Sequence, residues 1–241
     1  MLNQNDIIYQ GERLEVSLIV SRAINDLDLC QRFSEGHRKL LENHNVDLGP
    51  VDTSWYTDRN VYILVVKDEL SDEILGGSKL VISDGKGNLP MEKLLSEDYP
   101  ELSGLLSNLS KRGIVEISSL WNSRSIAGWG LGSEQLIKAS IVVSSFLDVD
   151  RVVTFCSPFV TRFAESYGFN PLEDFGENGA IPFPDNRWMS TINVLYDIDE
   201  MRLADISCKT EIFELKQNPI QTITYEKRGR NLKVNFYLIV Q

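Results

Sequence analysis

The residues from Ile114 to Ser157 are predicted to form a strand, a glycine-rich loop, an apolar helix and a second strand. The apolar run IVEISSLW leads into NSRSIAGWGLGSEQ, which is followed by LIKASIVVSSFLDV and RVVTFCSP. Gly128, Gly130 and Gly132 directly precede the helical periodicity. Glycines let the backbone approach a ligand closely, and the free N–H groups at a helix start attract phosphate. The order therefore predicts an α/β fold with a loop suited to a phosphorylated cofactor.

The glycines alone also fit a plain turn, because glycine-rich turns precede helices for steric reasons. Two phosphate-binding patterns are excluded. The loop has no Gly-Lys-Ser/Thr ending, so it is not the P-loop of nucleotide triphosphatases. A dinucleotide fingerprint needs GxGxxG and an acidic residue about 20 positions later. Here the third glycine follows too soon, and the next strand ends in Cys156 and Ser157.

The loop resembles the coenzyme A-binding loop of the GCN5-related N-acetyltransferase superfamily, whose pattern is Gln/Arg-x-x-Gly-x-Gly/Ala. In that superfamily the loop joins the fourth strand to the third helix and cradles the coenzyme A pyrophosphate. Ala127 replaces the Gln or Arg, so a side-chain contact is lost and backbone donors remain. The resemblance implies a coenzyme-binding segment in which Ser133 caps the helix, made up of Ala127, Gly128, Trp129, Gly130, Leu131, Gly132 and Ser133.

A second resemblance is to the acyl-homoserine-lactone synthases, which share this fold and load long acyl groups, usually from acyl carrier protein. Their strand motif, Trp-Glu-x-Ser-Arg, is matched here at Glu116 and Ser118, whereas Ser119 replaces the arginine. Lys79 replaces an arginine of the preceding strand, and the amino-terminal Arg/Phe/Trp set of those enzymes has no convincing counterpart. The acyl-transfer role therefore carries over better than the homoserine-lactone substrate. The matching segments are 74–95, 99–109 and 115–121.

The two resemblances cover roughly residues 14–199 and imply the acyl-CoA N-acyltransferase fold of the superfamily. This is an α/β fold with a mixed, mostly antiparallel central sheet flanked by helices. We expect residues 1–200 to form the acyltransferase domain and residues 201–241 to form a C-terminal extension packed on it. The end of the chain, PIQTITYEKRGRNLKVNFYLIV, predicts a β-hairpin that turns near 227–230 and adds strands or covers a sheet edge.

The other elements follow from period and capping signals. We expect a helix that starts at Asn25 or Asp26, and a polar loop at 43–60. Trp55 and Tyr56 of this loop either line an acceptor pocket or pin the loop. The expected strands are 13–23, 61–69, 74–84 and 189–199, and further helices are expected at 99–109 and 159–169.

Glu116 is the candidate general base. Strand alternation puts its side chain among apolar neighbours, where partial desolvation raises the pKa of a carboxyl group toward a useful range. The alternative is a structural carboxylate bonded to a neighbouring strand or to Lys79. The resemblance implies that backbone N–H groups near Leu120 and Trp121 polarise the thioester carbonyl. Cys156 is a weaker candidate for covalent chemistry, because no histidine is placed near it in the sequence.

The general acid of many superfamily members is missing. They carry a tyrosine four residues before the glycine that ends the fourth helix, and this position is Ala164 here. Tyr167 stands where the superfamily has an apolar core residue, so we expect it to pack in the core.

Composition narrows the class of protein. The 241 residues suit one large domain or a domain with an extension. No run of 18 uninterrupted apolar residues occurs, and the first residues lack a basic-then-apolar signal pattern. Three scattered cysteines form neither a disulfide framework nor a metal-binding spacing, so we expect a reducing, cytoplasmic environment. The two histidines do not favour a zinc site, and we expect no metal. The net charge of −11 argues against nucleic acid as a partner.

We therefore expect an acyltransferase that moves an acyl group from an acyl-CoA or acyl-carrier-protein thioester to a small-molecule amine. The alternatives are an acyl-homoserine-lactone-type autoinducer synthase, a small-acetyl N-acetyltransferase, or a non-catalytic acyl-thioester-binding protein. We expect the donor to carry more than an acetyl group. Residues 201–241 carry a net +3 and the rest −14. Lys227, Arg228 and Arg230 therefore either receive an acidic carrier protein, meet the coenzyme's 3′-phosphate, or form a solvated turn that protects an edge strand.

Overall fold

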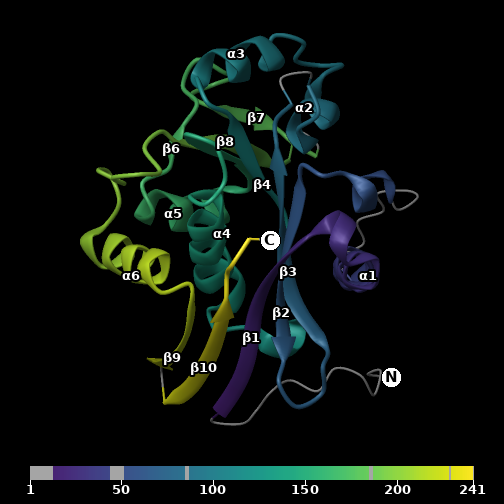
Figure 1. The fold of residues 1–241 in the computed structure, drawn as a ribbon. Coiled ribbons are helices and arrows are strands. Elements are labelled where there is room, and N and C mark those ends of the chain that lie inside the picture. The colour runs from purple at the N-terminus through teal and green to yellow at the C-terminus, as the bar shows by residue number, and fades with distance from the viewer. Residues whose placement is uncertain (1–12, 44–51, 85–86, 185–186, 228, 241) are drawn as a thin grey trace. The chain divides into compact units, whose positions relative to one another are not determined.

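The computed structural model describes residues 13–43, 52–84, 87–184, 187–227 and 229–240 (Figure 1). Arg228 lies outside the described residues, as do the first residues of the chain. The chain forms two compact units. The first contains residues 1–79, 119–139 and 217–241, and the second contains residues 80–118 and 140–216. Three elements contribute residues to both units: β3 (Ile74–Ile82), β4 (Ile114–Asn122) and α4 (Ile137–Ser144).

The first unit is built on strands in the order β3-β2-β1-β10-β9. β1 is antiparallel to β2 and parallel to β10, and β10 is antiparallel to β9. In Figure 1 the hairpin of β9 and β10 accordingly runs alongside β1. The central position of β1 and β2 explains their apolar sequences, since most of the side chains of β2 are buried. The bounds are β1 (Arg13–Arg22), β2 (Val61–Asp68), β9 (Ile220–Lys227) and β10 (Arg230–Tyr237).

Helix α1 (Leu27–Asn43) of the first unit is amphipathic, and it buries Leu29 and Phe33. It starts where expected, because the Asp26 carboxylate accepts a hydrogen bond from the Leu29 N–H at 2.9 Å. The other helical segments are short. They are the 3₁₀ turns η1 (Ala23–Asn25), η2 (Ser54–Thr57) and η3 (Arg124–Ile126), and a π-helical stretch, η4 (Leu131–Leu136), that leads into α4.

The second unit has strands in the order β6-β8-β5-β4. β4 and β5 are parallel, whereas β5, β6 and β7 are antiparallel to β8. Fully buried valines and isoleucines on these strands form its core. The strand bounds are β5 (Arg151–Cys156), β6 (Asn170–Pro171), β7 (Ala180–Pro182) and β8 (Met189–Leu195). The helices are α2 (Pro90–Leu95), α3 (Leu102–Leu109), α5 (Pro158–Ser166) and α6 (Ile206–Gln217).

The architecture confirms the predicted α/β class with mixed strands, flanking helices and a C-terminal hairpin. The sequence reasoning missed α2 and α6. In α6 apolar residues occur without a strong helical period, and few of its side chains are buried. The domain boundary at residue 200 stays a prediction. Among the described residues, no helix has the length and apolar character needed to span a membrane.

The fold yields a stability prediction at Gly36 in α1. A Cβ at this position would lie 2.1 Å from Cη2 and 2.6 Å from Cζ2 of Trp121, so the indole would have to move. Overpacking of this kind costs about 1–3 kcal/mol, more than the gain of up to about 1 kcal/mol from the helix preference of alanine. We therefore expect Gly36→Ala to lower the free energy of unfolding, measured by urea denaturation.

Gly104→Ala in α3 is the matched control. A Cβ added at Gly104 would meet no described atom within 4 Å outside its own stretch of helix, so this variant should gain about 0.5–1 kcal/mol. Equal stability changes in the two variants would show that Gly36 and Trp121 are not in tight contact.

Candidate functional site

The glycine-rich loop follows η3 and has a backbone that favours glycine at two positions. Gly128 and Gly130 both have φ of 80°, in the left-handed region that side chains rarely adopt. Gly130 is the residue at which the helical turns begin, with Leu131 as the first helical residue. The first N–H groups of a helix have no partner within it, so those of Leu131 and Gly132 are available to a ligand.

The third glycine brings the loop against the end of β4. A Cβ on Gly132 would lie 2.2 Å from Oδ1 of Asn122, the last residue of that strand, so a side chain there would collide. Replacing Gly132 would therefore force the Asn122 amide out of its present position. The prediction that Ser133 caps the helix is wrong: Gly130 is the N-cap and Ser133 lies within the first turn. The side chain of Ser133 lies outside the described part of the structure.

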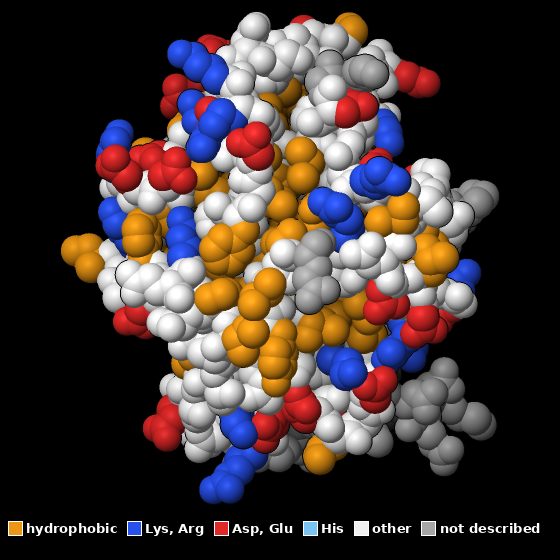
Figure 2. Space-filling view, viewed as in Figure 1, with side chains coloured by type: hydrophobic (Ala, Val, Ile, Leu, Met, Phe, Trp, Pro, Cys, Tyr) orange, Lys and Arg blue, Asp and Glu red, His pale blue; other side chains and the backbone are white. Residues whose placement is uncertain are grey.

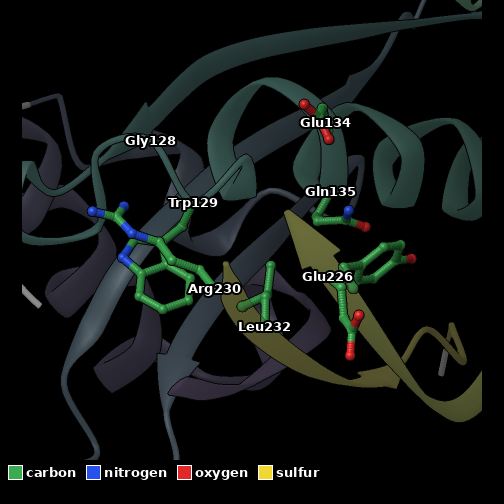
Figure 3. A pocket seen from close by; sticks show the side chains of 8 residues that line it. Gly128, Trp129, Glu134, Gln135, Glu226, Arg230 and Leu232 are labelled. Atoms are coloured by element: carbon green, nitrogen blue, oxygen red, sulfur yellow. The ribbon is translucent and has the colours of Figure 1, made fainter. Parts of the chain in front are cut away.

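A cavity of about 290 Å³ lies between this loop and the C-terminal hairpin. Trp129 is 4% exposed, and the Arg230 guanidinium stacks on it with 5.2 Å from Cζ to the ring centroid. The Trp129 Nε1 has no hydrogen-bond partner among the described residues. In Figure 3 the side chains of Trp129 and Arg230 lie against each other. The lining residues are Gly128, Trp129, Glu134, Gln135, Tyr225, Glu226, Arg230 and Leu232.

Lys138 connects the helix to the hairpin beside this cavity. Its Nζ donates to Gln135 Oε1 at 3.2 Å and to Tyr225 Oη at 3.3 Å, and lies 4.9 Å from the centre of the tyrosine ring. The side chain of Lys138 is buried, so these contacts replace water. Sequence reasoning named Arg230 among three hairpin cations that could meet the coenzyme's 3′-phosphate. It did not identify the contacts of the hairpin with Trp129 and Lys138, because the two segments are about 100 residues apart.

The end of β4 carries the two predicted carbonyl-polarising residues, Leu120 and Trp121. Among the described residues, β4 pairs with β5 as far as Ile117 and Thr154, although β4 continues to Asn122. Ser119 has φ of 48° in the middle of this strand, a conformation that costs a non-glycine residue about 1–3 kcal/mol. Such a kink changes the direction of the peptide groups that follow. The role of the Leu120 and Trp121 N–H groups stays a prediction.

Phe33 is the centre of an aromatic cluster in the first unit. Phe33 of α1 meets Trp121 and Trp55 edge-on, each with ring centroids 6.0 Å apart. Lys79 Nζ lies 5.1 Å above the ring of Trp55. These contacts favour the interpretation that Trp55 pins its loop to α1. His37 lies against Phe33 at 6.4 Å, and burial, together with the charge of Lys79, lowers the pKa of His37 to about 4.

A second cavity of the first unit, about 430 Å³, was not predicted from the sequence. Arg22 and Tyr62 line it, with the guanidinium Nε donating to the phenol oxygen at 2.9 Å. Ile220, Tyr237 and Ile239 also line it and are each about half exposed. Figure 2 shows hydrophobic side chains gathered on the face over β10. The alternating sequence of β10 indicated a strand with one buried face. It did not indicate that the residues on the other face line a cavity.

Glu116, the candidate base, belongs to the second unit and is 3% exposed. One carboxylate oxygen accepts a hydrogen bond from the Met91 N–H at 2.9 Å, which fixes the start of α2. Ser118, on the same face of β4, has a buried hydroxyl without a partner among the described residues. The hydrogen bond to Met91 gives Glu116 a structural role, which was the alternative interpretation from the sequence. The partner expected there was a neighbouring strand or Lys79. The catalytic role of Glu116 stays a prediction.

The remaining candidates of the second unit fit structural roles. Burial raises the pKa of the Cys156 thiol, which disfavours the reactive thiolate. Its Sγ lies 3.6 Å from Thr161 Oγ1 and 3.5 Å from Asn193 Nδ2. Ala164 and Tyr167 are both buried, as expected for a tyrosine that packs in the core. Among the described residues, no three His, Cys, Asp or Glu side chains are grouped as a metal site would require.

Comparison with known proteins identifies the fold. No family model and no curated protein matches the sequence. A CoA-dependent acyl-homoserine lactone synthase, BjaI, solved with SAM and isopentyl-CoA, superposes with a TM-score of 0.57 at 17% identity, covering 92% of this chain and 94% of BjaI. FeeM, an N-acyl amino acid synthase from uncultured soil microbes, gives 0.53 at 14% identity, covering 81% and 97%. Escherichia coli ElaA gives 0.52 at 12% identity, covering 74% and 98%.

The chain therefore has the fold shared by acyl-homoserine-lactone synthases and N-acetyltransferases of the GCN5-related type. This confirms at the level of the fold the resemblance seen in the loop at 127–133 and in the strand motif at 115–119. At identities of 11–18% the likeness concerns the fold, and the roles of single residues need their own support.

His37 predicts a pH dependence of stability. A histidine in the unfolded chain titrates near pH 6.5, whereas burial lowers the pKa in the folded chain to about 4. Between these values the unfolded chain binds more protons, so the contribution of His37 is complete above pH 6.5 and is lost as the pH falls toward 4. We expect about 2 kcal/mol less stability at pH 5 than at pH 7 from this group, measured by urea denaturation. His37→Gln should remove that part of the slope, and an unchanged slope would contradict the assignment.

Proposed function

We propose that this chain is an acyltransferase that moves an acyl group from an acyl-CoA thioester to the amine of a small molecule. The observation that carries the proposal is the loop at 127–133. It combines two left-handed glycines, a helix start, and a third glycine pressed against β4. Support comes from the fold, which this chain shares with a CoA-dependent lactone synthase and an N-acyl amino acid synthase.

The loop binds the coenzyme through its backbone. The pyrophosphate accepts hydrogen bonds from the free N–H groups of Leu131, Gly132 and Ser133, where the positive end of the helix dipole favours negative charge. The absence of Cβ atoms at Gly128 and Gly130 lets the phosphates come close to the backbone. Ala127, which is exposed, contributes no polar side chain.

In the transfer step the amine attacks the thioester carbonyl carbon, the new C–N bond forms, and the C–S bond breaks. Glu116 accepts the proton that the amine loses, directly or through water. Backbone N–H groups at Leu120 and Trp121 stabilise the negative charge that develops on the carbonyl oxygen. The departing thiolate takes its proton from water, because Ala164 stands where the superfamily has a tyrosine.

The donor carries an acyl chain longer than acetyl, as the resemblance of residues 74–121 to lactone synthases suggests. Each buried methylene adds about 0.8 kcal/mol, so a few extra carbons would outweigh acetyl clearly. Acyl carrier protein is the alternative donor. Because acyl carrier protein is acidic, the −14 charge of residues 1–200 would repel it, and it would need the positive charge of the hairpin to bind.

A second candidate function is acyl-thioester binding without catalysis. Two observations favour it: Ala164 replaces the expected acid, and the carboxylate of Glu116 is engaged by the Met91 N–H. Such a protein would bind thioesters through the same loop and would release no thiol in the presence of amines.

The first test is a screen of acyl-CoA and acyl-carrier-protein thioesters from acetyl to octanoyl, by thermal shift and by thiol release with a panel of amines. Wild type should bind a CoA thioester, and Gly130→Val should abolish binding, because valine is strained at φ of 80° and its Cβ would lie 3.1 Å from the Glu134 carboxylate. Gly87→Val is the control, since Gly87 has φ of 76° and, among the described residues, a Cβ there would meet only Ser103 Oγ, at 3.6 Å. Equal affinities in wild type and Gly130→Val would overturn the loop assignment.

The second test separates catalysis from structure at Glu116. Glu116→Gln keeps the shape and can still accept the hydrogen bond from Met91, but it cannot take a proton. Turnover should fall by about 10²–10⁴-fold while donor affinity is kept. Glu92→Gln is the matched control, because Glu92 is also buried and accepts a backbone N–H, that of Leu89, at 3.0 Å. If both variants turn over like wild type, Glu116 is structural.

A further inference from the structure

The C-terminal hairpin lies beside the glycine-rich loop. None of its residues is part of the sequence motif from which the loop was predicted. Arg230, the first residue of β10, lines the cavity that Gly128 and Trp129 line from the other side (Figure 3). Its Nη1 lies 3.7 Å from the place where a Cβ on Gly128 would be. The guanidinium is therefore in contact range of the loop backbone.

Two hydrogen-bond donors meet at this point. The Trp129 Nε1 can only donate, and it is buried with no partner among the described residues. The Arg230 guanidinium can also only donate, and its contact with Trp129 is made through the face of the indole ring. A buried donor without an acceptor carries a free-energy cost. An anionic oxygen placed between the two groups would satisfy both.

We propose that Arg230, together with the Trp129 Nε1, binds the pyrophosphate of the coenzyme. Arg230 thereby supplies, from the C-terminal hairpin, the polar side chain that the loop lacks at Ala127. The proposal rests on the proposed function, since it requires the loop to bind a coenzyme. Arginine suits this role because its fork of N–H groups matches phosphate oxygens.

The other charges around the cavity make the binding of an anion depend on Arg230. Glu134 and Glu226 also line the cavity and would repel an anion. Lys138 Nζ donates hydrogen bonds to Gln135 and Tyr225, and Lys138 is not among the residues that line the cavity. Replacing Arg230 by a neutral residue would leave the two carboxylates to face the phosphates. The position beside Gly128 favours the pyrophosphate over the 3′-phosphate, because in the proposed function the pyrophosphate binds to the helix-start N–H groups of this same loop.

The experiment measures, by isothermal titration calorimetry, the dissociation constants of coenzyme A, 3′-dephospho-coenzyme A and pantetheine. Arg230→Gln should weaken both phosphorylated ligands equally, by about 10- to 100-fold, and leave pantetheine unchanged. Trp129→Phe keeps the ring and removes the Nε1 donor, so it should weaken the same two ligands by about 3- to 10-fold. Arg38→Gln is the matched control, because Arg38 lies on α1 of the same unit and pairs with Glu42 at 3.7 Å.

The outcomes separate this proposal from the function on which it rests. If coenzyme A binds to wild type, is lost in Gly130→Val and is unchanged in Arg230→Gln, the proposed function stands and the role of Arg230 is wrong. A loss in Arg230→Gln seen with coenzyme A and absent with the dephospho form would assign Arg230 to the 3′-phosphate and overturn the pyrophosphate contact. If wild type binds none of the three ligands, both proposals fail.

Discussion

The candidate site depends on the contact between Gly132 and the end of β4. Because a Cβ at Gly132 would lie 2.2 Å from Asn122 Oδ1, the Asn122 amide can keep its position against the helix start only while residue 132 has no side chain. This approach sets where the free N–H groups of the helix lie relative to the end of β4. The left-handed turns at Gly128 and Gly130 bring the chain back from η3 into this position. All of these residues lie within one compact unit, so the loop and the strand end keep a defined geometry.

The same unit places the C-terminal hairpin against the loop. β10 pairs in parallel with β1, and Arg230 and Tyr225 of the hairpin face Trp129 and Lys138. Both cations, Arg230 and Lys138, lie over an aromatic ring, which offsets part of the cost of removing them from water. In a chain with a net charge of −11, Arg230 and Lys138 thus place two positive charges beside the loop, while Glu134 and Glu226 line the same cavity.

Much of the fold followed from local signals. Strand alternation predicted β1, apolar runs predicted β2, β4 and β5, and the Asp26 cap marked the start of α1. The capping rule failed at Ser133, because the glycine at 130 already provides the backbone turn that ends the loop. Sequence reasoning also missed α2, although Pro90 and Glu92, which accepts the Leu89 N–H, are local signals for its start. Glu116, a residue of a distant strand, adds an acceptor for the Met91 N–H. Glu116, which the sequence indicates as a candidate general base, thus also accepts a structural hydrogen bond.

The sequence by itself determined which residues can form the loop, because glycine spacing and helical period are local properties of the chain. It also determined the net negative charge of the chain and which segments form strands. Only the tertiary structure decided what faces the loop. Arg230 lies about 100 residues beyond Gly128, and its contact with Trp129 arises from the pairing of β10 with β1. Strand pairing over such distances depends on the register of the whole sheet, which no local pattern encodes.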